Sequence, residues 1–98
     1  RRWIRIAMQN LNPELAKSFG VDTATGAIVV GIYRNGPART AGLTPGNIIT
    51  NVNGEAIQNG EEIANYALNM EPGTILELQG IHNGKAASWS VTIGPKQQ

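Results

Sequence analysis

The residues of this chain that could perform acid–base, nucleophilic or metal chemistry are few and scattered. His82 is the single histidine, Asp22 is the single aspartate, and cysteine is absent. A nucleophilic serine needs a base and an orienting carboxylate beside it, and no G-x-S-x-G stretch presents one. We therefore expect a chain that is not itself an enzyme and that has no metal site and no cofactor. We expect His82 to be a solvated turn residue.

Composition narrows the class of protein further. The chain has 98 residues, of which 41% are hydrophobic, and a formal net charge of +1. This length suits one domain, and the near-neutral charge argues against a nucleic-acid partner. No apolar run approaches the roughly 20 residues of a membrane helix. Because the first residue is Arg1, we expect the chain to be part of a longer one.

The elements that would shape a site are clearest in the middle of the chain. The residues predict, in order, a short helix from Pro37, a left-handed residue at Gly42 and a type II turn at Thr44-Pro45-Gly46. An apolar run at 48–52 then predicts a buried strand, and Asn53-Gly54 predicts a hairpin turn after it. This order of elements is a specific local pattern.

Residues 36–54 resemble the central signature of PDZ domains, G/S-P-A-x-x-A-G-L-x-x-G-D-x-I-x-x-V-N-G. The spacing agrees at all nineteen positions, and Asn47 stands where the family usually has Asp. Asn can make the same local bond from its side chain to the backbone, so we expect little change in shape. The alternative is an unrelated α+β domain with a helical turn before a hairpin.

The rest of the chain predicts an α+β fold with many short strands. We expect a small, curled, antiparallel sandwich or open barrel of five to six strands with two helices, as the PDZ resemblance also implies, in residues 1–94, followed by a polar tail at 95–98. In the first helix, Leu15 and Phe19 should face the body, and a turn should span His82–Lys85. The predicted strands lie at 2–9, 27–33, 55–57, 74–81 and 86–93. Apolar and polar residues alternate in the first and the last of these strands, and in the last one Trp89, Val91 and Ile93 should face inward and Ser88 and Ser90 outward. The predicted helices lie at 12–20, capped by Asn12, and from 59 to about 70, capped by Asn59.

Three segments resemble one branch of PDZ proteins, the HtrA-family serine proteases of bacteria, whose strand order is permuted. Trp3-Ile4-Arg5-Ile6 takes the place of the family's Tyr-Ile-Gly-Ile or Trp-Leu-Gly-Val loop, and residues 11–21 are similar to the helix that follows it. Residues 26–38 are most similar to the DegS-like, single-PDZ stress sensors. The resemblance covers residues 2–93.

The resemblance implies a binding site for the C-terminus of another protein. In PDZ domains an extended peptide adds to a strand edge, and backbone N–H groups of a loop hold its carboxylate. Matched residue by residue, the loop is Trp3, Ile4, Arg5 and Ile6, the pairing strand is Ala7, Met8 and Gln9, and the groove helix presents Ala64, Ala67 and Leu68.

Arg5 departs from the usual glycine of this loop, and three interpretations stay open. Its charge could favour the carboxylate, it could be a solvated surface residue, or it could distort the loop and weaken binding. The small Ala64 and Ala67 predict a roomy pocket for a last residue such as Phe or Tyr. Alternatively, both alanines are simply good helix formers under a closely packed strand.

The function implied is a regulatory PDZ domain of an HtrA/DegS-like serine endoprotease, which binds hydrophobic C-termini of misfolded envelope proteins and controls proteolysis. Its partners would be those C-termini and the protease domain of the same chain, in a periplasmic, homotrimeric parent anchored to the inner membrane. One alternative is a PDZ module of another bacterial protein, a site-2-type metalloprotease or a secretion component. Another is a domain that Arg5 blocks and that serves only as a packing contact.

Overall fold

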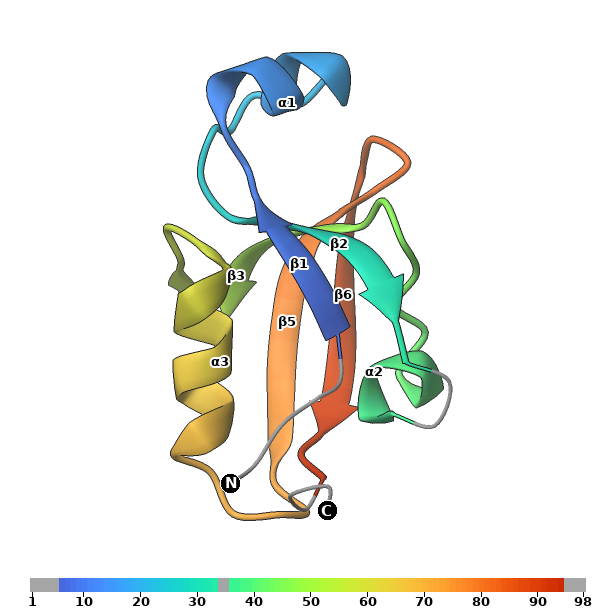
Figure 1. Ribbon diagram of the computed structural model, residues 1–98, viewed down its shortest axis with the longest axis vertical. Helices are drawn as coiled ribbons and strands as arrows, with labels where there is room; N and C mark the ends of the chain where they lie inside the picture. Colours follow the sequence, from blue (N-terminus) through green and yellow to red (C-terminus); the bar gives the residue numbers. More distant parts are fainter. Residues whose placement is uncertain (1–5, 34–35, 95–98) are drawn as a thin grey trace.

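The computed structural model describes residues 6–33 and 36–94, and the fold within them is one antiparallel sheet with three helices (Figure 1). The sheet has six strands in the order β1-β2-β3-β5-β6, and β4 pairs with β3 outside this path. The strands are β1 (Ile6–Asn10), β2 (Ala27–Ile32), β3 (Ile48–Val52), β4 (Glu55–Ala56), β5 (Ile75–His82) and β6 (Lys85–Thr92). The helices are α1 (Pro13–Ser18), α2 (Pro37–Thr40) and α3 (Gly60–Leu68). The predicted fold class is confirmed, with the short turn after Gly36 counted as a third helix.

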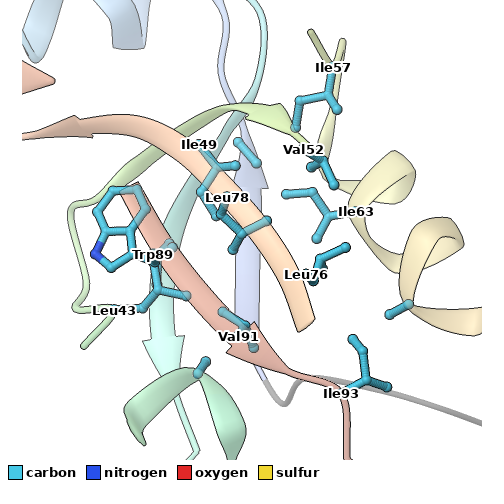
Figure 2. Close-up of a cluster of buried hydrophobic side chains, with 14 residues drawn as sticks. Leu43, Ile49, Val52, Ile57, Ile63, Leu76, Leu78, Trp89, Val91 and Ile93 are labelled. Atoms are coloured by element: carbon cyan, nitrogen blue, oxygen red, sulfur yellow. The ribbon is translucent and has the colours of Figure 1, made fainter. Parts of the chain in front are cut away.

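The main hydrophobic core lies between the β5–β6 hairpin, β3 and α3 (Figure 2). The predicted alternation of β6 is confirmed, because Trp89, Val91 and Ile93 are buried and Ser88 and Ser90 are exposed. A second cluster joins α1 to the sheet through Leu11, Ala16, Ile28 and Ile48. The main core therefore holds α3 against the β5–β6 hairpin.

The turns follow the local patterns of the sequence. Asn53 and Gly54 both have positive φ (51° and 84°), as a two-residue hairpin turn requires. The last hairpin is tighter than predicted: His82 and Lys85 pair as strand residues, and the turn is Asn83-Gly84 alone. These two residues have φ of 50° and 78°, which matches the right-handed twist of the strands that they join.

The central stretch forms the elements that its signature predicts. Gly42 and Gly46 have φ of 92° and 98°, and the amide of Asn47 donates to the Thr44 carbonyl to close the turn. The Asn47 side chain is 2% exposed, and its Oδ1 accepts from the Thr44 amide at 2.8 Å. This local bond is the one predicted for the residue that replaces the usual Asp.

Both longer helices begin at an asparagine cap. Asn12 Oδ1 accepts from the Leu15 amide at 2.9 Å, and Asn59 Oδ1 accepts from the Glu62 amide at 3.3 Å. The predicted burial of Phe19 is wrong: its side chain is 43% exposed, because α1 ends at Ser18 and Phe19 is only the cap.

Candidate functional site

The first strand, β1, lies at one end of the sheet and pairs only with β2 among the described strands. An edge strand of this kind presents unpaired N–H and C=O groups to which another extended chain can add. The side chains of Ile6 and Met8 are half-buried against the main core, whereas Ala7 and Gln9 are exposed. The free edge therefore has an apolar inner side.

Helix α3 runs beside this edge (Figure 1). The amide of Gly60, its first residue, donates to Asn10 Oδ1 at the end of β1, at 2.9 Å. Gly60 is buried, and a methyl group at its position would lie 3.5 Å from the Cβ atoms of Met8 and Ala27. The start of α3 is thus packed directly on β1.

The two flanks of α3 face different strands. Ile63 and Ala67 are buried in the core, at 0% and 2% exposure. Tyr66 marks one flank, since its hydroxyl donates to the Glu55 carboxylate on β4 at 2.6 Å. Because successive helical residues turn by about 100°, Ala64 and Leu68 lie together on a flank roughly 160° from Tyr66. Gly60, which packs on β1, lies four positions before Ala64 and eight before Leu68, so this flank continues the side of the helix that contacts β1.

The predicted site residues that the structure describes therefore border one surface. We call it the β1–α3 face: the free edge of Ile6–Asn10 together with Ala64, Ala67 and Leu68. Ala64 is exposed and Leu68 is 40% exposed, while Ala67 is buried beneath them. The remaining predicted loop residues, Trp3, Ile4 and Arg5, and the tail at 95–98 lie outside the described residues.

The sequence matches the family described as "PDZ domain" over residues 4–93. The chain belongs to the PDZ domain family.

Curated relatives of this PDZ domain include "Probable periplasmic serine endoprotease DegP-like" from Pseudomonas savastanoi pv. phaseolicola and from Brucella suis biovar 1. The first is 35% identical over 96% of the chain, and the second is 37% identical over 95%. The chain spans only 20% and 18% of the length of these two relatives.

Solved structures are similar to this PDZ domain over nearly its whole length. "HtrA-type protease AlgW with decapeptide" has a TM-score of 0.85 at 30% identity, covering 100% of this chain and 30% of that one. "HtrA3 PDZ Domain Bound to a Phage-Derived Ligand (FGRWV)" has a TM-score of 0.80 at 25% identity, covering 95% of this chain and 85% of that one. Both of these structures are named with a peptide ligand.

Two residues at the border of the β1–α3 face were missed by sequence reasoning. Asn10 and Gly60 are fifty positions apart, and neither the strand pattern nor the helix cap signals that they meet. Their contact depends on how the chain between them folds.

A hydrogen bond joins Tyr66, on the flank of α3 away from β1, to Glu55. The hydrogen bond to Glu55 raises the pKa of Tyr66, and desolvation and the nearby carboxylates add to this effect. The pair ties α3 to β4, so the helix is tied to strands on both flanks.

His82 is exposed, as expected of a solvated residue, but it is the last residue of β5 and does not lie in the turn. Its Nδ1 lies 2.7 Å from Nδ2 of the Asn47 side chain, and because an amide NH2 group can only donate, the ring nitrogen accepts. The imidazole thus supports the buried turn before β3, and no carboxylate orients it in the contacts that the structure gives. Within residues 6–33 and 36–94, no three His, Cys, Asp or Glu side chains are grouped as metal ligands, and no helix is long and apolar enough to span a membrane.

Proposed function

We propose that this PDZ domain regulates an HtrA-type serine endoprotease by binding hydrophobic C-termini of misfolded envelope proteins. The observation that carries the proposal is the free edge of β1 beside α3. The relatives, named as periplasmic serine endoproteases, and the peptide ligands of the structural neighbours support it.

Binding proceeds by strand addition. The ligand's backbone pairs antiparallel with Ile6–Asn10, and its carboxylate accepts from backbone amides of the loop Trp3–Ile6. Its last side chain packs beside Ala64, Ala67 and Leu68. A few net hydrogen bonds of about 1 kcal/mol each and one buried side chain of about 2–3 kcal/mol must offset the entropy of association. The dissociation constant should therefore be micromolar or weaker.

We propose that this PDZ domain, residues 1–94, is part of a longer periplasmic chain. Catalysis belongs to a protease domain of that parent, which we propose to be a homotrimer anchored to the inner membrane. Residues 26–38 favour a DegS-like parent with one PDZ domain, whereas the relatives reported above are named DegP-like. The full sequence of the parent decides between these branches.

The test is titration calorimetry with two hexapeptides of identical sequence that end in Phe, one with a free carboxylate and one with a carboxamide. The free acid should bind with a micromolar dissociation constant, and the amide at least tenfold more weakly, because only the carboxylate is held by charge-assisted hydrogen bonds. A scrambled free-acid peptide with a C-terminal Asp is the control. Equal binding of acid and amide, or no binding of either, would contradict the proposal.

A further inference from the structure

Asn10 joins the two walls of the β1–α3 face. It is the last residue of β1, and its Oδ1 accepts the amide proton of Gly60, the first residue of α3. This hydrogen bond is a direct polar contact between β1 and α3, and the Cβ atom of Met8 lies close to Gly60 beside it. The separation of the strand and the helix is therefore fixed at this end.

The local caps of α3 do not supply this bond. Asn59 Oδ1 accepts a hydrogen bond from the Glu62 amide, and the Glu62 carboxylate accepts one from the amide of Gln58. The amide of Gly60 is one of the donors that a helix leaves unsatisfied at its start. This donor is satisfied by the side chain of Asn10 on β1, so the bond ties α3 to the pairing strand.

The Asn10–Gly60 bond lies beside particular residues of a ligand strand that pairs with β1. A ligand antiparallel to β1, with its carboxylate at the Ile6 end, has its upstream residues at the Asn10 end. Along the helix axis Gly60 is about 6 Å from Ala64 and about 12 Å from Leu68, the lengths of about two and about four extended residues. The last ligand residue thus lies beside Ala64 and Leu68, and the third and fourth from the end lie beside Asn10 and Gly60.

We propose that Asn10 is a positioning residue that sets the spacing between β1 and α3 for the third and fourth ligand residues from the carboxyl end. The inference rests on the proposed function. Because the bond fixes the spacing between β1 and α3 before the ligand binds, binding of side chains at these ligand positions does not include the entropic cost of ordering the helix. Loss of the bond should weaken selection at these positions and leave selection of the last residue unchanged.

The test compares the unchanged domain with Asn10→Ala in a double-mutant cycle with three free-acid peptides: a parent peptide, one with alanine at the third position from the end, and one with alanine at the last position. In Asn10→Ala, the loss of affinity from alanine at the third position should shrink by about fivefold, the effect of one net hydrogen bond. The loss from alanine at the last position should be the same in both domains. Asn10→Asp keeps an acceptor for the Gly60 amide and should restore the unchanged pattern.

Two variants separate positioning from simple loss of stability. Asn59→Ala removes the local cap of the same helix without touching β1, and should weaken all three peptides equally. Asn65→Ala makes the same substitution on an exposed part of α3 and should change nothing. Amide exchange at Gly60, which should accelerate in Asn10→Ala and not in Asn65→Ala, reports the bond without a ligand.

If the unchanged domain binds the peptides and Asn10→Ala lowers the affinity for all three equally, this inference is wrong and the proposed function still holds. Slow exchange at Gly60 in Asn10→Ala would also overturn it. Absence of binding by the unchanged domain would overturn the proposed function, and the inference with it.

Discussion

At the scale of single residues, the proposed ligand preference depends on two small side chains of α3. Ala67 is 2% exposed and lies within the core, so it forms a floor, whereas Ala64 is exposed beside the half-exposed Leu68. Only Ala64 can therefore change the space above this floor without disturbing the core. That difference makes the predicted roomy pocket testable.

Ala64→Met should lower the affinity for a peptide ending in Phe by about tenfold, because the longer side chain fills the space proposed for the ring. The affinity for the same peptide ending in Ala should change less than threefold. Fluorescence polarisation with labelled peptides measures both values. Met is a good helix former at an exposed position, so the midpoint of thermal unfolding should move little. Better binding of Val- or Ala-ending peptides than of Phe-ending ones by the unchanged domain would contradict the roomy pocket.

At the scale of elements, the site depends on how closely β3 and β5 approach. Gly80 on β5 pairs with Ile49 on β3, next to an irregularity in the register. A Cβ atom at Gly80 would overlap the carbonyl oxygen of Ile48, which belongs to the backbone and cannot move aside alone. β2 and then β1 continue the sheet on the other side of β3, so the edge strand of the site is attached to the body through β3.

Gly80→Ala should therefore destabilise the fold by about 3 kcal/mol or more, as overpacking against backbone does. Gly31→Ala on β2 is the matched control. Its methyl group would meet the Ala7 side chain at 3.6 Å, an ordinary contact, and the substitution should be neutral or stabilise by about 0.5 kcal/mol. Urea unfolding of both variants gives the comparison. Equal midpoints for the two would show that the Ile48 carbonyl does not restrict this position.

At the scale of the whole molecule, features set by neighbours in sequence could be predicted, and features set by folding could not. The caps at Asn12 and Asn59 and the turn at Asn53-Gly54 each involve residues at most three positions apart, and all three are confirmed. The Asn47–His82 bond spans 35 positions, and the Asn10–Gly60 bond spans 50. Neither has a local pattern, because each forms only when the sheet brings the two residues together.

The candidate site divides in the same way. The signature at 36–54 was sufficient to indicate the PDZ family, and the alternation of β1 was sufficient to indicate a strand, but the free edge depends on the strand order. Phe19 shows the reverse case. Its spacing from Leu15 predicted burial, yet it is exposed because the helix ends before another turn can form.

The central claim is that a ligand adds to the free edge of β1. Amide hydrogen exchange, measured residue by residue with and without a free-acid peptide ending in Phe, tests it most directly. The account predicts that added peptide protects amides within Ile6–Asn10 and leaves those of β6, the strand at the other end of the sheet, unchanged. Protection along β6, or no change in β1 when the peptide is bound, would contradict it.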